Sequence, residues 1–357
     1  MDYESILSRE PYSLSQSEKE KIYIPYMRKL TAYHESHCEK YKTLLRALGC
    51  RVDLIKSIAD IPMIPVNLFK QEHLSSVVQS DSFKIMTSSG TTGKASSKIY
   101  LDARTAEYQQ RTLIKIVSDY IGTKRLPMLI IDSPEVLRNR SEFSGRGAGV
   151  LGFSIFSSRR QYALDGDMNL DVKGITSFLN RFQGSPILVF GFTYIIWKHF
   201  CQAMKIANIH FDLSQAILIH GGGWKKMINQ AVTKDEFKLG LQECCGIKTI
   251  HNYYGMVEQT GCIYMECEYG HLHASTYSEI LFRNMKDFSV CDVGEIGTIQ
   301  VLSPMTESYP GHSILTDDEG ILLGIDNCPC GRTGKYFAIL GRLQHAELKG
   351  CSDTYEG

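Results

Sequence analysis

The chain has 357 residues, of which 43% are hydrophobic and 22% are charged, an ordinary composition for a globular protein of one large or two moderate domains. Lys plus Arg and Asp plus Glu both number 39, so no charge bias indicates nucleic acid or a membrane surface as a partner. No apolar run approaches the roughly 20 residues of a spanning helix, and the start MDYESILSREPY lacks the features of a signal peptide. The eleven cysteines therefore favour reduced thiols, a metal site or a reactive thiol, and we expect a cytoplasmic protein.

The first part of the chain is expected to be helical. Apolar residues recur at three- and four-residue spacing between residues 18 and 48. Two prolines in IPMIPVNLFK, residues 61–70, forbid a regular helix there. We therefore assign residues 1–82 to a helical N-terminal segment.

From residue 83 onward the pattern alternates between strands and helices. A short strand at 83–86 precedes a loop rich in glycine and hydroxyl groups, and residues 105–120 are expected to form a helix. Apolar strands that end in Gly or Asp are expected at 127–132, 186–191 and 216–223. Each strand leads towards a helical segment, which is typical of an α/β fold with buried strands. Residues 83–261 are therefore assigned to an α/β nucleotide-binding core.

The remainder of the chain, residues 262–357, has a different sequence pattern. Short strands separated by turn residues are expected at SEILF, GTIQVL, HSILTDDEGILLG and KYFAILGRL. We assign this region to a smaller β-rich subdomain with a short C-terminal tail.

The loop MTSSGTTGK, residues 86–94, resembles a phosphate-binding element in composition. Gly90 and Gly93 allow backbone N–H groups to approach an anion. The hydroxyl groups that can add donors belong to Thr87, Ser88, Ser89, Thr91 and Thr92. Only two residues separate the glycines, so the loop is not a Walker A motif. By composition alone, a flexible surface loop is an equal alternative.

Two later motifs extend the pattern. HGGGWKK starts at residue 220, and HNYYGMVEQTG starts at residue 251. In this order the three motifs resemble the adenylate-forming enzyme superfamily, with Val257 where the superfamily usually has Thr. The closest resemblance is to the acyl-protein synthetase (LuxE) family, carried by IPMIPVNLFK, TSSGTTGK, VFGFTYII, HGGGWK, ILTDDEG and KGCS. The resemblance extends from about residue 61 to the C-terminus. It implies a large adenylate-forming domain whose C-terminal lid is reduced or absent.

The resemblance also implies a function. We expect ATP- and Mg²⁺-dependent activation of a carboxylic acid, expected to be a fatty acid, to acyl-AMP. The acyl group would then pass to a protein cysteine thiol, for a partner acyl reductase or an acyltransferase or acyl-carrier partner. One alternative is an acyl- or aryl-CoA ligase similar to phenylacetate-CoA ligase. Another is a nucleotide-binding partner subunit that has lost catalysis.

Individual site residues follow from the same resemblance. Glu258 matches the carboxylate that binds Mg²⁺, and Lys94 would add a charge at the pyrophosphate, although a solvated loop lysine is an alternative. Cys351 in KGCS would accept the acyl group, unless it is an incidental cysteine in a disordered tail. Lys349 is the late lysine nearest the expected lid position, and whether it replaces the lid lysine stays open. The expected ATP-binding residues are Thr87, Ser88, Ser89, Gly90, Thr91, Thr92 and Gly93 at the pyrophosphate end, Gly221, Gly222, Gly223 and Tyr254 at the adenine, Asp317 and Arg342 at the ribose hydroxyls, and Gly255. Gly191, Phe192 and Tyr194 would line the acyl pocket or, equally, end a core strand.

Cysteine and histidine residues near the C-terminus suggest a metal site. ECEYGHLH and CPCGR contain C-x-C and H-x-H pairs, and thiolate and imidazole ligands suit tetrahedral structural zinc. These segments depart from the LuxE pattern towards phenylacetate-CoA-ligase-like enzymes, some of which bind zinc there. The expected ligands are Cys267, His273, Cys328 and Cys330, with His271 as a substitute and Cys262 as a further candidate. The alternative is a set of buried cysteines that act as small hydrophobic residues.

Overall fold

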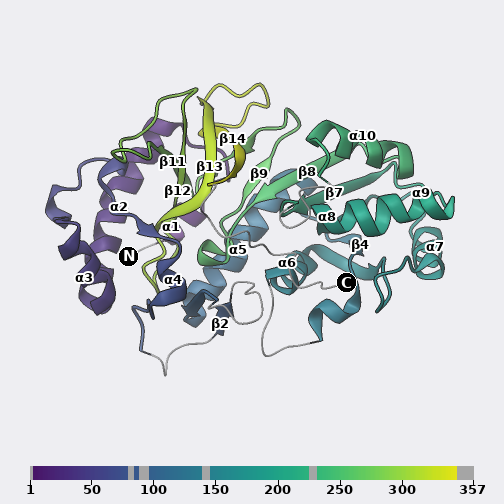
Figure 1. The fold of residues 1–357 in the computed structure, drawn as a ribbon, viewed down its shortest axis with the longest axis horizontal. Coiled ribbons are helices and arrows are strands. Elements are labelled where there is room, and N and C mark those ends of the chain that lie inside the picture. Colours follow the sequence, from purple (N-terminus) through teal and green to yellow (C-terminus); the bar gives the residue numbers. More distant parts are fainter. Residues whose placement is uncertain (1–2, 79–83, 88–95, 139–144, 225–230, 344–357) are drawn as a thin grey trace. The chain divides into compact units, whose positions relative to one another are not determined.

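The computed structural model describes residues 3–78, 84–87, 96–138, 145–224 and 231–343, which form two compact units (Figure 1). Unit 1 takes its described residues from 3–78, 84–87, 96–119 and 255–343. Unit 2 takes its described residues from 120–138, 145–224 and 231–254.

The helices assigned wholly or mainly to unit 1 are α1 (Glu4–Leu7), α2 (Gln16–His37), α3 (Glu39–Ala47), α4 (Leu68–Gln71) and α5 (Ala103–Ile121). A capping box starts α2, in which Ser15 and Glu18 each accept a hydrogen bond from the other's backbone N–H. The helical prediction for residues 18–48 is confirmed except at Cys38, where the extended backbone separates α2 from α3, and at Leu48, which follows the end of α3. Helix α5 confirms the prediction for residues 105–120.

One face of α2 packs on the β-rich part of unit 1. Tyr23, Met27 and Leu30 project from α2 at helical spacing and are fully buried. They form a core cluster with residues that include Leu281 of β11 and Leu302 of β12, and Figure 1 shows the purple helix beside these strands. Burial of these apolar side chains holds the N-terminal helix on the sheet.

Unit 1 contains an antiparallel series of strands. Its order is β11 (Glu279–Arg283), β12 (Ile296–Leu302), β13 (Ser313–Ile325), β14 (Lys335–Arg342), β10 (Leu272–His273) and β9 (Tyr264–Glu266). All four strand segments expected after residue 262 are present. Strand β1 (Ile64–Pro65) pairs with β13 in parallel.

The predicted strand at residues 83–86 is β2 (Lys84–Thr87), one residue later. It pairs antiparallel with β3 (Lys98–Leu101), which the sequence did not predict, in a separate two-stranded sheet.

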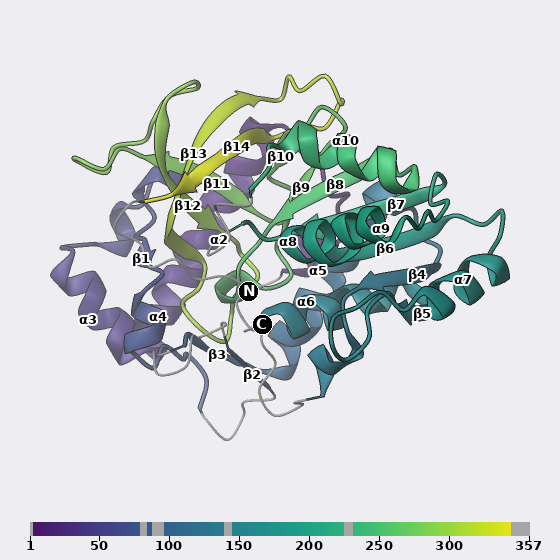
Figure 2. The same cartoon turned by 45° about the vertical axis from the view of Figure 1, so that its right-hand side comes forward.

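Unit 2 is built on a parallel sheet. Its strand order is β8 (Thr249–Tyr254), β7 (Ala216–Gly221), β6 (Ile187–Phe192), β4 (Leu126–Ile131) and β5 (Ser157–Tyr162). Its helices are α6 (Gly145–Phe153), α7 (Val172–Arg181), α8 (Thr193–Ile195), α9 (Ala203–Ala207) and α10 (Lys234–Cys245), with a π-helical stretch, Ile196–Gln202, between α8 and α9. Figure 2 shows α7 beside the edge strand β5. The three predicted apolar strands correspond to β4, β6 and β7, which confirms the α/β fold class.

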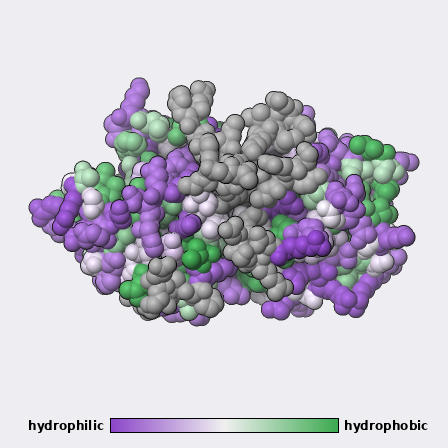
Figure 3. Space-filling view, turned by 60° about the horizontal axis from the view of Figure 1, so that its bottom comes forward, coloured by the Kyte–Doolittle hydropathy of each residue, from purple (hydrophilic) through white to green (hydrophobic). Residues whose placement is uncertain are grey.

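Apolar and polar residues are mixed on the face seen in Figure 3, and the described helices show no membrane span. In the view of Figure 3, apolar residues form scattered green groups among polar ones. Across the described ranges, no helix combines the length and the apolar character needed to cross a bilayer.

Candidate active site

The carboxyl ends of three parallel strands in unit 2 bring predicted site residues together. In the strand register, Gly191 of β6 pairs with His220 of β7, and Phe192 pairs with Gly221. Gly221 pairs in turn with Tyr253 of β8. Ligands of open α/β sheets bind outside the carboxyl ends of the strands. This edge is therefore the part of unit 2 where the expected adenine and acyl residues lie side by side.

Thr193 fixes the glycine-rich segment at this edge. Its hydroxyl oxygen lies 3.1 Å from the backbone oxygen of Gly221 and 2.7 Å from that of Gly222. The same oxygen lies 2.9 Å from Nδ1 of His220. Gly222 has a φ of +76°, a left-handed conformation that favours glycine. The expected acyl motif GFTY contains Thr193, although the sequence did not single out this residue.

The three expected acyl-pocket residues have different surroundings. A Cβ atom at Gly191 would lie 2.9 Å from Cγ1 of Ile196, so core packing at the end of β6 requires glycine there. Phe192 is buried, and a Cβ atom on Gly149 would lie 2.9 Å from its ring. Tyr194 is also buried, within the short helix α8. The environment of Gly191 favours the core strand end over a pocket lining.

The ring that contacts the glycine-rich segment belongs to Tyr253. A Cβ atom at Gly221 would lie 2.5 Å from Cε1 of Tyr253. Tyr254, the expected adenine contact, is the next and last residue of β8 and is partly exposed. Because neighbouring strand residues point to opposite faces, the two tyrosine rings lie on opposite faces of the sheet. The role of Tyr254 stays a prediction, as does that of Gly255, which begins the next segment of unit 1.

Glu258 lies in unit 1, in the short 3₁₀ helix Val257–Gln259, and is 5% exposed. Burial raises the pKa of its carboxyl group, because desolvation disfavours the charged form. A hydrogen bond with Ser97 and the positive charges of Lys70 and Arg342 act against this rise in pKa. Glu258 is therefore a buried carboxyl group whose charged form would gain from a bound cation.

Three hydrogen bonds from two side chains hold the backbone around Glu258. The hydroxyl of Tyr309 donates to the backbone oxygen of Glu258 at 2.7 Å. The side-chain amide of Gln259 donates to the backbone oxygens of Val301 at 3.2 Å and Gly311 at 2.8 Å. All of these side chains are buried, so the turn that carries Glu258 is fixed from the side of β12 and the segment before β13.

Asp317 and Arg342, the expected ribose contacts, lie on neighbouring strands β13 and β14 of unit 1. The two carboxylate oxygens of Asp317 each lie 3.2 Å from Nδ2 of Asn67. Nε of Arg342 lies 3.4 Å from an oxygen of Asp318, its partner in the strand register. Both groups are partly exposed, so they are available to a ligand.

Four unit 1 contacts around these residues were not expected from the sequence. They involve Asn67, Lys70, Ser97 and Tyr309. Asn67 and Lys70 belong to the quoted motif IPMIPVNLFK, which was a usable signal. Ser97 and Tyr309 carry no local sequence pattern, and only the fold brings them to Glu258.

The predicted metal ligands come together in unit 1. One ligand atom from each of Cys267, His273, Cys328 and Cys330 lies within 4.8 Å of the others. Sγ of Cys330 is 3.4 Å from Nε2 of His273, whose Nδ1 has no hydrogen-bond partner within the described structure. Three thiols and one imidazole form a donor set that suits tetrahedral zinc.

The two further candidates for this site differ from the four. His271 lies beside it, with Nδ1 3.3 Å from Sγ of Cys328. Cys262 lies outside the cluster, where its thiol contacts Oγ of Ser303 at 3.0 Å and the backbone oxygen of Tyr277 at 3.3 Å.

Several expected site residues fall outside the described residues. They are Ser88, Ser89, Gly90, Thr91, Thr92, Gly93, Lys94, Lys349 and Cys351. Thr87 is the last residue of β2, and Gly223 follows β7 with open space around a Cβ atom.

Comparison with known proteins decides the family. A family model described as acyl-protein synthetase, LuxE, matches residues 2–356. This chain belongs to that family. It is 25% identical to the long-chain-fatty-acid–luciferin-component ligase of Aliivibrio fischeri, over 97% of this chain and 91% of that protein. Identity to the ligase of the same name from Vibrio harveyi is 22%, over 96% of this chain and 89% of that protein.

A solved structure gives the same fold. The chain superposes on a crystal structure of 2-hydroxyisobutyryl-CoA ligase in complex with 2-HIB-AMP and CoA, with a TM-score of 0.72 and 13% identity. The match covers 94% of this chain and 77% of that one. The family and the fold confirm the expected adenylate-forming architecture and the expected enzyme class, an ATP-dependent acid–thiol ligase.

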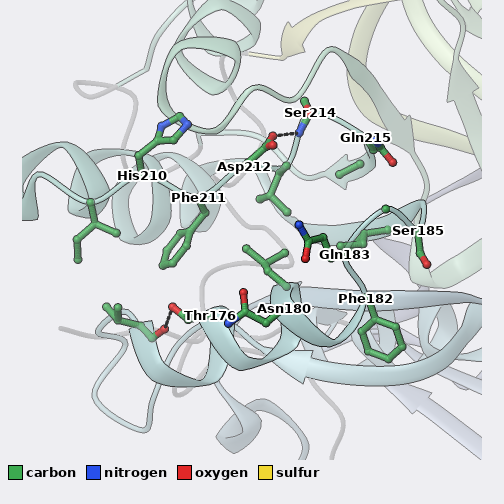
Figure 4. A pocket seen from close by; sticks show the side chains of 17 residues that line it. Thr176, Asn180, Phe182, Gln183, Ser185, His210, Phe211, Asp212, Ser214 and Gln215 are labelled. Atoms are coloured by element: carbon green, nitrogen blue, oxygen red, sulfur yellow. Dashed lines mark hydrogen bonds between the residues drawn. The ribbon is translucent and has the colours of Figure 1, made fainter.

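Unit 2 also contains a pocket (Figure 4). It has a volume of about 620 Å³ and lies at the amino ends of β6 and β7, where Ile187 and Ala216 begin those strands. Thr176 and Asn180 line it from α7, and Asp212, which accepts a hydrogen bond from the backbone of Ser214, lines it from the segment before β7. The expected adenine and acyl residues lie at the opposite, carboxyl ends of the same strands, so the pocket is not their binding site.

Proposed function

We propose that this acyl-protein synthetase family member activates a fatty acid with ATP and Mg²⁺ and transfers the acyl group to its own Cys351. From there the acyl group would pass to a partner acyl reductase or acyl carrier. The luciferin-component ligases named above support a long-chain fatty acid as the substrate class.

The observation that carries the proposal is the setting of Glu258. Its carboxylate is desolvated, and its backbone is fixed by Tyr309. Hard oxygen ligands of this kind suit Mg²⁺, which commonly takes one or two carboxylates together with phosphate oxygens. A divalent cation at this position would favour the ionised carboxylate and would neutralise charge on the triphosphate.

Other residues would bind the nucleotide. Asp317 and Arg342 of unit 1 would contact the ribose hydroxyls, and Gly221–Gly223 and Tyr254 of unit 2 would contact the adenine. The loop from Thr87 to Gly93, with Lys94, would bind the pyrophosphate end through backbone N–H and hydroxyl donors. Such pre-organised donors stabilise the charge that develops on the phosphates during adenylation.

The chemistry has two steps. In the first, an oxygen of the fatty carboxylate attacks the α-phosphorus of ATP, the bond to the β-phosphate oxygen breaks, and pyrophosphate leaves. In the second, a thiolate attacks the acyl carbon, a thioester forms, and AMP leaves with the electron pair of the broken C–O bond. Cys351 would provide that thiolate, with Lys349 nearby to favour the anion.

The test is a panel of carboxylic acids offered with ATP and Mg²⁺, with pyrophosphate release as the first readout and the intact mass of the protein as the second. The proposal expects acid-dependent pyrophosphate release and a mass increase equal to one acyl group. An acid-dependent release with no mass increase but with turnover of added CoA would favour the alternative, an acyl- or aryl-CoA ligase. ATP binding with no acid-dependent release would favour a nucleotide-binding subunit without catalysis.

We also propose a structural zinc ion bound by Cys267, His273, Cys328 and Cys330. The convergence of four donor atoms supports it. Burial lowers the pKa of His273 to about 3, with smaller contributions from the charges of Arg332 and His271. The imidazole is therefore neutral, as a metal ligand must be. The ion would join the turn after β9, strand β10 and the turn between β13 and β14.

A further inference from the structure

The motif IPMIPVNLFK, which the sequence singled out, has no part in the function proposed above. In the fold its second half forms β1 and α4, beside the carboxylate expected to bind ribose. β1 pairs in parallel with β13 through Ile64 and Pro65, and Val66 N–H continues the pairing with a hydrogen bond of 2.9 Å to the backbone oxygen of Leu315. This register brings the next residue, Asn67, to Asp317.

Asn67 links the ammonium group of Lys70 to the carboxylate of Asp317. Its Nδ2 lies 3.2 Å from each carboxylate oxygen of Asp317, and its Oδ1 accepts a hydrogen bond of 2.6 Å from Nζ of Lys70. The amide thus uses its donor side for the anion and its acceptor side for the ammonium, which leaves one orientation of the side chain. Both oxygens of Asp317 keep lone pairs that can accept hydrogen bonds from a ligand.

The segment is anchored to the same tyrosine that holds Glu258. Phe69, between Asn67 and Lys70, is 1% exposed and packs edge-on against the ring of Tyr309, with 6.2 Å between ring centroids. The hydroxyl of Tyr309 donates to the backbone oxygen of Glu258. The Phe69–Tyr309 contact therefore ties the segment that carries Lys70 to the turn that carries Glu258.

The ammonium group of Lys70 is contacted by a neutral amide oxygen. In the part of the chain that the structure describes, its ammonium is hydrogen-bonded to the neutral Oδ1 of Asn67 and forms no direct ion pair. Its positive charge nevertheless acts on Glu258. A partly exposed ammonium that is held by a neutral amide and forms no ion pair within the described residues is suited to bind an external anion.

We propose that Lys70 binds a phosphate of the nucleotide and that Asn67 is a positioning residue, which holds Lys70 and orients Asp317 towards the ribose hydroxyls. The inference rests on the proposed function, because that function assigns the nucleotide to these carboxylates. It adds a phosphate-binding cation on unit 1 that is separate from Lys94 and Lys349.

The test of Lys70 compares ATP with adenosine, which has the base and the ribose but no phosphate. Lys70→Gln keeps a donor for Asn67 but removes the charge. We expect its dissociation constant for ATP to rise about 10- to 100-fold, the range of one charge-assisted hydrogen bond, with adenosine binding unchanged. Lys70→Arg should recover part of the ATP affinity. Lys42→Gln, at another partly exposed lysine of unit 1, is the matched control and should bind ATP as the wild type does.

The test of Asn67 uses a readout that a loss of stability would not change. Asn67→Asp has the same size and keeps the contact with Lys70, but places a second carboxylate against Asp317. Repulsion between the two carboxylates should turn Asp317 away from the ribose hydroxyls. The variant should then lose most of the wild-type preference for ATP over 3′-deoxy-ATP. An unchanged preference would remove Asn67 from the proposal.

The outcomes separate the two claims. A wild-type protein that binds neither ATP nor adenosine would overturn the proposed function, and this inference with it. An active wild type together with a Lys70→Gln variant of unchanged ATP affinity would overturn the inference alone. An equal loss of ATP and adenosine binding in Lys70→Gln would also overturn it, because Lys70 would then support the site without contacting a phosphate.

Discussion

Tyr309 and Glu258 are joined by a hydrogen bond of 2.7 Å from the tyrosine hydroxyl to the glutamate's backbone oxygen, in the interior of unit 1. The contact bridges 51 residues of sequence and fixes the turn on which the expected Mg²⁺ ligand lies. A buried hydroxyl thereby holds the backbone that carries the Glu258 carboxylate.

Removing the Tyr309 hydroxyl should weaken catalysis by more than the loss of folding stability alone would cause. Tyr309→Phe leaves the Glu258 carbonyl without its donor and should lower the free energy of unfolding by about 1–2 kcal/mol. The matched control is Tyr23→Phe, since the Tyr23 hydroxyl also donates to a buried backbone oxygen, that of Thr276 at 2.9 Å. Both variants should lose similar stability in urea unfolding, but only Tyr309→Phe should need more Mg²⁺ for half-maximal pyrophosphate release. Equal Mg²⁺ requirements would show that the contact is structural only.

Glu258 itself should be needed for adenylation. Glu258→Gln keeps the size of the side chain and removes the charge, so the fold should remain. Acid-dependent pyrophosphate release should fall by at least about 10²-fold, the scale of losing one charge partner of the transition state. Circular dichroism checks the fold, and a variant with near-normal release would refute the assignment of Glu258.

The cysteine–histidine cluster should hold about one zinc ion per chain. Elemental analysis of protein purified without a polyhistidine tag measures this directly. Cys330→Ser should lose the ion and lower the thermal unfolding temperature, because metal binding contributes free energy to the folded state. Cys291→Ser, at a buried cysteine of unit 1 outside the cluster, should keep the ion. A wild-type protein without zinc, whose Cys328 and Cys330 are alkylated in the native state, would contradict the site.

Two stacked histidines of unit 1 should make stability depend on pH. The rings of His34 and His312 lie 5.0 Å apart, and burial lowers the pKa of both, that of His312 to about 3. The unfolded chain takes up protons below about pH 6.5 that the folded protein does not, so stability is full above that pH and falls as pH decreases towards 3.

The expected slope is up to about 1.4 kcal/mol per pH unit for each histidine between pH 6 and 4.5. His312→Asn should reduce the slope by the contribution of one proton. Urea unfolding of the wild type and the variant across this range provides the measurement, and identical slopes would contradict the prediction.

Cys351 should carry the acyl group. Incubation with ATP and a radiolabelled fatty acid should label the protein with a bond that hydroxylamine cleaves, as a thioester requires. Cys351→Ser should abolish the label but keep pyrophosphate release, because the thiol acts only after adenylation. A label that persists in Cys351→Ser would place the acceptor at another residue.

Sequence pattern located the elements whose signals are local. The apolar runs of β4, β6 and β7 predict those strands to within two residues, because a buried parallel strand is apolar on both faces. Strand β5, with the sequence SSRRQY, has no such run and was missed; it lies at the sheet edge and carries exposed side chains. The break at Cys38 was missed because the apolar spacing continues across it.

Candidate site residues could be assigned from the sequence only where they lie within short motifs. Glu258, Asp317 and the pair Cys328 and Cys330 were each assigned from residues within one segment, and their roles stay predictions. The contact of Asn67 with Asp317 spans 250 residues and depends on the parallel pairing of β1 with β13, which no local pattern encodes. For Gly191 the motif left a pocket lining and a core strand end as equal alternatives, and the lack of room for a Cβ atom beside Ile196 favours the strand end.

The measurement that tests the central claim most directly is exchange of radiolabelled pyrophosphate into ATP, which reports reversible adenylate formation without any thiol acceptor. The account predicts that the wild-type protein catalyses this exchange only when a fatty acid and Mg²⁺ are both present. Exchange that is absent with every carboxylic acid tested, in a protein that binds ATP, would contradict it.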